Sequence, residues 1–190
     1  MSVSRASTNR KPKKPEPLAE AALYDYAVRA LGRRMRTVAE LKRLMRTRVE
    51  PDDSGEAKML RVVARLQEHR YLDDAAYAAT YTRLRQENQK FGRRRVQQDL
   101  ARKGVANDRI ASAIDKGYEN VSEEALARDH LARKRIAPPS NEKESARVVR
   151  LLLRAGFSTG TIFKILRDWR VSEETLAALE TIDANDDADS

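Results

Sequence analysis

Hydrophobic residues recur along this chain at helical spacing and not in the alternation typical of strands. Apolar side chains fall three or four positions apart in stretches that begin at Leu23, Leu41, Tyr77 and Ile162. That spacing places them on one face of an α-helix. The six prolines stand at positions 12, 15, 17, 51, 138 and 139, where they mark tails and loops. The pattern predicts an all-α protein.

A longer pattern occurs twice in the second half of the chain. An apolar residue is followed by glycine at +4 and by further apolar residues at +5, +10 and +14. The two sets are Leu100, Gly104, Val105, Ile110 and Ile114, and Leu152, Gly156, Phe157, Ile162 and Leu166. Glycine suits the +4 position because helices often end in a left-handed residue. A looser first copy is predicted from Leu44, with Arg48 at +4, Val49 at +5, and Val62 and Leu66 after an insertion.

Each copy follows another amphipathic stretch, so the pattern predicts three tandem three-helix repeats. Thr37 and Glu40 have the spacing of a capping box at the start of one helix. Both ends of the chain are charged and poor in apolar residues, so we expect residues 1–17 and 183–190 to be mobile. The predicted parts are a basic tail at 1–17, repeats at 18–70, 71–118 and 119–172, and an acidic C-terminal tail at 173–190.

The charge of the chain lies mainly on its predicted helices. The formal net charge is +9, of which residues 1–17 contribute +4 and residues 173–190 contribute −7, leaving +12 on residues 18–172. A body this basic indicates a polyanionic partner. A solvated basic surface without a partner is the plainer alternative.

The candidate binding residues are the lysines and arginines of the three repeats, which are densest at 83–103. Within that segment we expect Arg94, Arg95 and Arg102 to project away from the apolar stripe of their helix. The alternative is a solvated face with an Arg95–Asp99 pair that contributes only about 0.3–0.5 kcal/mol. The candidates are Arg83, Arg85, Arg93, Arg94, Arg95, Arg102, Lys103, Lys42, Arg43, Arg46, Arg150, Arg154, Lys164 and Arg167.

Catalytic and metal-binding patterns are missing from the sequence. There is no cysteine, no glycine-rich phosphate loop, and only two histidines, His69 and His130, which we expect on helix surfaces or at helix ends. No apolar run reaches the ~20 residues that cross a bilayer. We therefore expect a protein without enzymatic activity, cofactor, metal or membrane anchor. Trp169, Tyr77 and Tyr81 are interpreted as core residues.

The middle repeat carries an ordered series of motifs that resembles the central signature of the RecX family. The series is Tyr71-Leu72-Asp73-Asp74, Tyr77-Ala78, Arg83, Arg85, Phe91-Gly92, Arg95, Leu100 and Lys103-Gly104-Val105. The sequence departs from the family pattern in three places. The segment before Gly92 is one residue longer, Arg48 replaces a glycine in the first repeat, and the acidic C-terminal end lies outside the resemblance.

The resemblance implies an elongated, curved helical stack that lies along the groove of the RecA–DNA filament. It implies inhibition of the RecA recombinase and its ATPase, and so a role in homologous recombination, DNA repair and the SOS response. It also implies weak binding of the protein alone to DNA, which we expect to be single-stranded. We expect a cytoplasmic monomer. The alternatives are a sequence-nonspecific single-stranded nucleic-acid-binding helical protein and a helical-repeat adaptor for an acidic protein partner.

Overall fold

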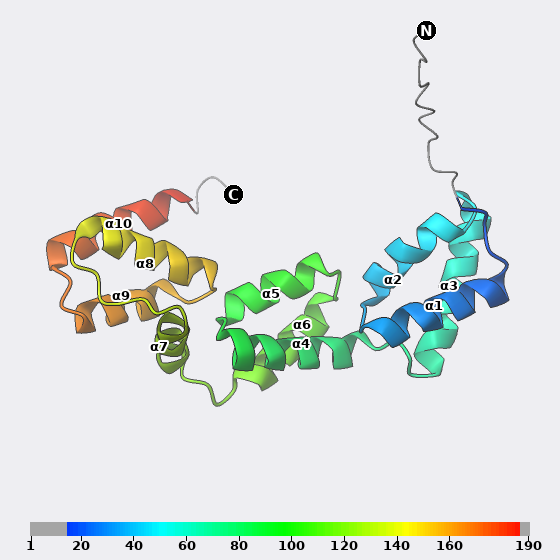
Figure 1. The fold of residues 1–190 in the computed structure, drawn as a ribbon, viewed down its shortest axis with the longest axis horizontal. Coiled ribbons are helices and arrows are strands. Elements are labelled where there is room, and N and C mark those ends of the chain that lie inside the picture. The colour runs from blue at the N-terminus through cyan, green and yellow to red at the C-terminus, as the bar shows by residue number, and fades with distance from the viewer. Residues whose placement is uncertain (1–14, 187–190) are drawn as a thin grey trace, which may run out of the picture. The chain divides into compact units, whose positions relative to one another are not determined.

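The computed structural model describes residues 15–186 as helices joined by short loops, with side chains described to residue 179 (Figure 1). No strand occurs within these residues, so the prediction of an all-α protein is confirmed. The chain divides into two compact units that meet in sequence at Asp73 and Asp74. The N-terminal unit contains the first repeat, and the C-terminal unit contains the second and third.

The N-terminal unit packs three helices around an aliphatic core. These helices are α1 (Glu20–Arg33), α2 (Val38–Met45) and α3 (Asp53–Glu68), with a 3-10 turn at Arg46–Arg48. Its fully buried side chains include Leu23, Leu41, Met45 and Leu66. The capping box at the start of α2 is confirmed. The Thr37 hydroxyl accepts the Glu40 amide at 3.0 Å, and the Glu40 carboxylate accepts the Thr37 amide at 3.4 Å.

The register predicted for the first repeat was wrong by one residue. Met45 is fully buried, whereas Leu44 only packs against the edge of the core. The reason lies in how α2 ends. A 3-10 turn follows it directly, so Val49 reaches the core without the left-handed residue that closes the corresponding helices of the other repeats.

The C-terminal unit contains seven helices that share one continuous hydrophobic core. They are α4 (Asp74–Gln89), α5 (Arg93–Arg102), α6 (Asn107–Tyr118), α7 (Glu123–Arg133), α8 (Glu142–Arg154), α9 (Thr159–Asp168) and α10 (Glu173–Asp186). The predicted glycine stops are confirmed. Gly104 and Gly156 have φ of +76° and +87°. The amides of Val105 and Phe157 donate back to the first residue of each motif, both at 3.2 Å, as in a Schellman motif.

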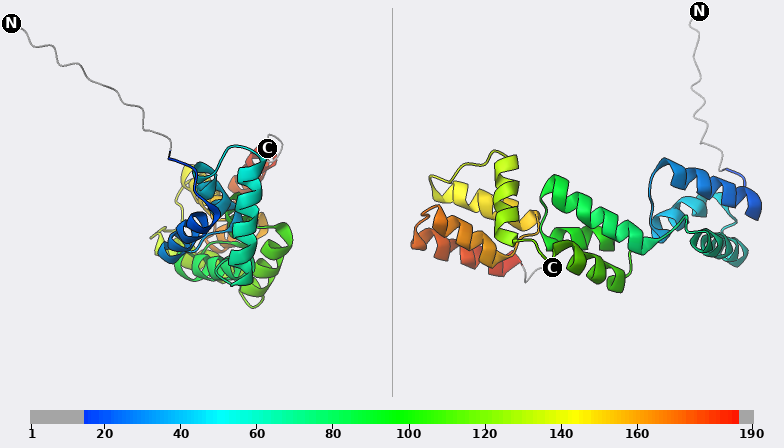
Figure 2. Two further views of the ribbon diagram at one scale, coloured as in Figure 1. Left: turned by 90° about the vertical axis from the view of Figure 1, so that its right-hand side faces the viewer. Right: turned by 90° about the horizontal axis from the view of Figure 1, so that it is seen from below.

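Residues 173–186 differ from the predicted acidic tail, because they form helix α10. Leu176 and Leu179 are buried, and α8, α9 and α10 lie side by side in Figures 1 and 2. The apolar pair, spaced three residues apart, gives this acidic segment one face that packs on the third repeat. The third repeat therefore continues beyond residue 172. The mobility predicted for residues 1–14 and 187–190 lies outside the described residues.

The second and third repeats are joined where the start of α5 meets the end of α8. The Gly92 amide donates to the Ala155 carbonyl at 2.8 Å. A Cβ on Gly92 would lie 2.2 Å from the Gly156 carbonyl oxygen, and a Cβ on Gly156 would lie 2.2 Å from the Arg95 nitrogen. Both positions therefore require glycine, because the opposing atoms belong to backbone that cannot swing aside.

Candidate polyanion interface

The expected basic ridge on α5 is held by a buried acid. The Asp99 side chain is only 10% exposed and forms ion pairs with Arg102 and, at 3.2 Å, with Arg95 Nε. Its other carboxylate oxygen accepts the Tyr81 hydroxyl at 3.2 Å, and Arg95 also donates to the Arg154 carbonyl at 3.2 Å. Arg95 thus links α5 to the end of α8, so the expectation that it projects clear of the packing was wrong. Arg102 does project from α5, with its side chain 66% exposed, and among the described residues it pairs only within its own helix.

Arg93, the first residue of α5, contacts Tyr118 at the end of α6. Its guanidinium donates to the Tyr118 carbonyl at 2.7 Å and lies over the Tyr118 ring, 5.5 Å from the centroid. The Tyr118 hydroxyl in turn donates to the Phe91 carbonyl at 2.7 Å, and burial raises the pKa of this tyrosine. Arg93 therefore fastens the start of α5 to the end of α6.

Three further candidates of the second repeat contact neighbouring side chains. Tyr77 and Tyr81 stack with centroids 6.0 Å apart, and Lys103 lies 5.7 and 5.5 Å from their rings. Arg85 covers the Tyr81 ring at 4.7 Å. Arg83 forms an exposed ion pair with Glu87 at 2.9 Å.

Arg94 is the exposed α5 candidate without an ion pair or hydrogen bond from its side chain to a described residue. It lines a groove of about 290 Å³ between α5 and α6, together with Gln97, Gln98, Ala101, Asn107 and Ile110. Its charge also acts on Glu123. Burial alone would raise the pKa of Glu123, but hydrogen bonds from Ser158 and Thr161, together with Arg94, outweigh burial and lower it.

Four more of the candidate cations form ion pairs, two in the first repeat and two in the third. Lys42 and Arg46 each lie 3.9 Å from the Glu56 carboxylate, whereas Arg43 is exposed without an ion pair to any described residue. On α9, Lys164 pairs with Glu124 at 2.6 Å and Arg167 with Glu173 at 3.6 Å. The hydrogen bond with Lys164 lowers the pKa of Glu124, and the same bond raises the pKa of Lys164.

Helix α8 carries a row of basic side chains with few internal partners. Four exposed cations follow one another at +4, +7 and +11, which places them within about 60° of the helix circumference. They are Lys143, Arg147, Arg150 and Arg154, hereafter the α8 stripe. None forms an ion pair with a described residue, although Arg154 Nε donates to the Arg150 carbonyl of its own helix at 3.1 Å. Sequence reasoning named two members among its candidates and missed the stripe, although the spacing signals it.

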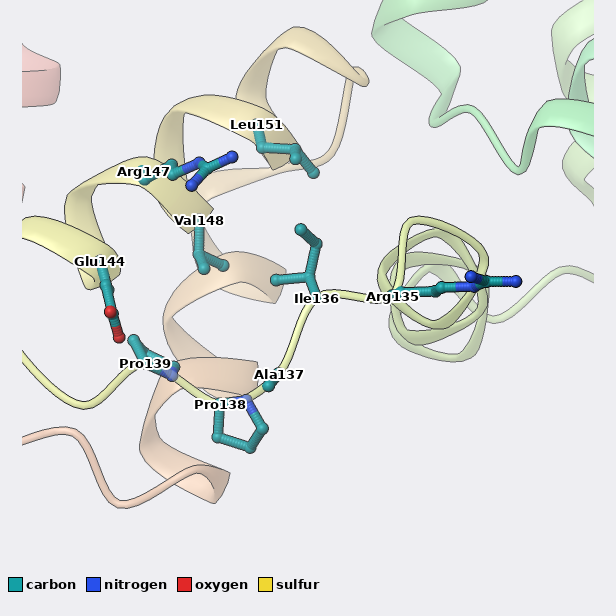
Figure 3. A pocket seen from close by; sticks show the side chains of 9 residues that line it. All are labelled: Arg135, Ile136, Ala137, Pro138, Pro139, Glu144, Arg147, Val148 and Leu151. Atoms are coloured by element: carbon teal, nitrogen blue, oxygen red, sulfur yellow. The ribbon is translucent and has the colours of Figure 1, made fainter.

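A pocket lies beside the α8 stripe, between α8 and the loop that follows α7. Its volume is about 220 Å³. Figure 3 shows Ile136 of the loop facing Val148 and Leu151 of α8, while the Arg135 side chain points away. The full lining is Arg135, Ile136, Ala137, Pro138, Pro139, Glu144, Arg147, Val148 and Leu151.

The two histidines occupy different environments. His69 follows the last residue of α3 and lies at the surface. Its Nδ1 shares a hydrogen bond with the Tyr24 hydroxyl at 2.8 Å. His130 is only 3% exposed and donates from Nδ1 to the Gln89 carbonyl at 2.9 Å. Its ring lies 5.9 Å from each of Phe91 and Phe157. Burial lowers the pKa of His130. This histidine lies in the last turn of α7, one of the two positions expected for it, but it is buried and not at the surface.

Groups of side chains that could hold a metal are absent from the part of the chain that the structure describes. Within the same residues, no helix is both long and apolar enough to cross a membrane. The surface features that stand out are therefore the α5–α6 groove, the α8 stripe and the neighbouring pocket.

Comparison with known proteins shows the family to which the chain belongs. Residues 73–114 match the model of the second three-helix domain of RecX. The regulatory protein RecX of Shigella dysenteriae is 32% identical over 170 residues, covering 86% of this chain and 97% of that protein. The regulatory protein RecX of Mycolicibacterium vanbaalenii is 34% identical over 146 residues, or 73% of this chain and 77% of that one.

Two solved structures share the fold. A crystal structure of RecX from Lactobacillus salivarius superposes with a TM-score of 0.59 at 22% identity, covering 80% of this chain and 96% of that one. A second crystal structure of regulatory protein RecX gives a TM-score of 0.61 at 22% identity, covering 78% of this chain and 71% of that one. These structures share the fold, and the relatives of 32% and 34% identity show the family: this chain belongs to the RecX family.

Proposed function

We propose that this protein binds the RecA–DNA filament in the cytoplasm and lowers RecA's ATP hydrolysis and strand exchange. Through this it modulates homologous recombination, DNA repair and the SOS response. The observation that carries the proposal is family membership, since relatives called regulatory protein RecX match this chain over 77% to 97% of their own length. The protein acts by binding and hydrolyses nothing itself.

The distribution of charge supports a polyanionic partner. Most candidate cations of the second repeat are engaged internally, but the four cations of the α8 stripe and Arg94 of the groove face solvent without an ion pair to a described residue. Such cations can contact phosphates or carboxylates without giving up an internal partner. Phosphate contacts release counterions, so DNA binding through them weakens steeply with salt.

The test measures RecA's DNA-dependent ATP hydrolysis and strand exchange while the protein is added below the concentration of RecA. Both activities should fall, and the protein alone should hydrolyse no ATP. Unchanged RecA activities across a range of salt concentrations would reject the proposal.

A matched pair of variants refines this test. Arg147→Gln/Arg150→Gln removes two unpaired charges, whereas Lys164→Gln/Arg167→Gln removes two charges that already pair with Glu124 and Glu173. The first variant should inhibit RecA less than the wild type does. The second should retain most of its inhibition.

A single-strand binder without a recombinase partner is the main alternative. It predicts tight binding to oligo(dT) with a steep salt dependence and no effect on RecA beyond competition for DNA. Saturating the reaction with extra single-stranded DNA separates the two functions, because only simple competition is relieved by it.

A further inference from the structure

The pocket beside the α8 stripe is aliphatic. The side chains of Ile136, Pro138, Val148 and Leu151 line it, and no aromatic side chain does. A nucleobase usually binds to single-strand sites by stacking on an aromatic ring. The pocket therefore suits an aliphatic protein side chain better than a base.

The size of the pocket limits what it can hold. Its volume of about 220 Å³ is below the roughly 300–1,000 Å³ of pockets that enclose small-molecule ligands. A space of this size accepts a single side chain from a larger partner, as anchor residues do at protein interfaces.

The charge around the pocket indicates the charge of its partner. Residues 133–154 carry seven basic side chains and only two acidic ones. Arg147 belongs both to the lining and to the α8 stripe, and Arg150 follows it on the same face. The lining carboxylate, Glu144, already accepts the Ser140 amide at 2.8 Å and its hydroxyl at 2.9 Å. Arg147 also helps to lower the pKa of Glu144, but the segment keeps a net positive charge. Net positive charge beside an aliphatic pocket is complementary to carboxylates beside an aliphatic side chain.

We propose that the pocket and the α8 stripe together dock an acidic segment of a partner protein, which inserts one aliphatic side chain between Ile136 and Leu151. This deepens the proposed function, because it assigns α8 to the protein component of the RecA–DNA filament and not to its nucleic acid. The apolar anchor gives specificity, and the flanking carboxylates pair with Arg147 and Arg150.

A first experiment probes the surface without RecA. Methyl spectra of the full chain are recorded at low salt while the peptide Glu-Glu-Leu-Glu-Glu is added, with Glu-Glu-Ala-Glu-Glu as the matched probe. The leucine peptide should shift the Ile136, Val148 and Leu151 methyls and bind about tenfold more tightly, as burial of one apolar anchor allows. Equal binding of both peptides would overturn the proposal.

Ala137→Phe fills the pocket from an exposed loop position, and Ala132→Phe adds the same ring to an exposed position of α7 outside the lining. The first variant should bind the two peptides equally, while the second should behave like the wild type. Continued preference of Ala137→Phe for the leucine peptide would overturn the proposal.

A second experiment measures RecA inhibition and oligo(dT) affinity on the same variants. Ala137→Phe should inhibit RecA about tenfold less well with its oligo(dT) affinity unchanged. A parallel loss of both would assign the pocket to nucleic acid and overturn the inference. If the wild type bound the leucine peptide in the pocket but left RecA unaffected, the proposed function would fail while the docking surface stood.

Discussion

Helices α5 and α8 are each the second helix of their repeat, yet their arginines differ in the contacts that they make. Each helix presents arginines at the same two offsets from its buried leucine, Arg95 and Arg102 in α5 and Arg147 and Arg154 in α8. One residue before that leucine, α5 has the buried Asp99 and α8 has Leu151. The acid pairs with both α5 arginines, although Arg102 stays exposed, whereas the aliphatic Leu151 leaves those of α8 without an ion pair to a described residue and lines a pocket instead.

The comparison shows that exposed arginines of a basic helix stay without ion pairs where the position beside them is aliphatic and not a buried acid. Surface ion pairs contribute little, but a nearly buried carboxylate that gathers two arginines and a tyrosine costs more to disrupt. Each helix carries four basic side chains, so counting them along the sequence does not separate the two situations. The burial of a carboxylate does, because only α5 has a buried acid among its arginines.

The largest expected effect comes from breaking the contact between the two helices. Gly156→Ala places a Cβ against the backbone of Arg95 and forces a left-handed conformation on a residue with a side chain. The C-terminal unit should lose about 3 kcal/mol or more of unfolding free energy. Urea unfolding followed by circular dichroism measures this.

Gly160→Ala provides the matched control, because the space around that helical glycine is open. This variant should gain about 0.5–1 kcal/mol of unfolding free energy. Equal stabilisation by both substitutions would contradict the close approach of α5 and α8.

A second effect follows from removing the acid that distinguishes α5. Asp99→Leu gives α5 the residue type of α8 and releases Arg95, Arg102 and the Tyr81 hydroxyl. We expect a loss of about 2 kcal/mol from charge-assisted hydrogen bonds, together with tighter binding to oligo(dT) because two cations are freed. Unaltered stability and DNA affinity would show that Asp99 holds neither arginine.

A third, smaller effect compares charge reversals on the two helices. Arg95→Glu/Arg102→Glu places two carboxylates beside Asp99 and should lower the unfolding free energy by about 1–2 kcal/mol. Arg147→Glu/Arg150→Glu should change it by no more than about 0.5 kcal/mol. Thermal melts of the two double variants test this, and equal melting temperatures would contradict the difference between the helices.

The smallest effect concerns pH at the joint between the repeats. His130 has a pKa below its ordinary value because it is buried, so the folded state binds fewer protons there than the unfolded state. Its contribution to stability is therefore present above the unfolded pKa of about 6.5 and is lost as pH falls toward the folded pKa. Urea unfolding of the wild type and His130→Gln between pH 7.5 and 5.5 should show a steeper decline for the wild type. Parallel curves would contradict a buried neutral imidazole.

Much of the fold could be predicted from the sequence, because helical periodicity and glycine stops are local. Gly104 and Gly156 occupy left-handed positions as their spacing indicated. The first repeat was misaligned because a 3-10 turn leaves no glycine to mark the end of α2. Helix α10 was missed because its acidic composition hid the buried pair Leu176 and Leu179.

The site was harder to predict, because the exposure of a cation depends on side chains from other elements. Arg93 is held by the end of α6, and Arg95 by both Asp99 and the end of α8. His130 is buried by aromatic residues distant in sequence. Only the spacing of the α8 stripe could have been detected from the sequence alone.

The most direct test measures RecA ATPase inhibition for the wild type and for two variants of equal charge, Arg147→Gln/Arg150→Gln and Arg95→Gln/Arg102→Gln. After correction for the folded fraction of each variant, the α8 variant should lose about tenfold in inhibitory potency and the α5 variant should lose little. Equal losses, or a larger loss in the α5 variant, would contradict the claim that α8 carries the free binding surface.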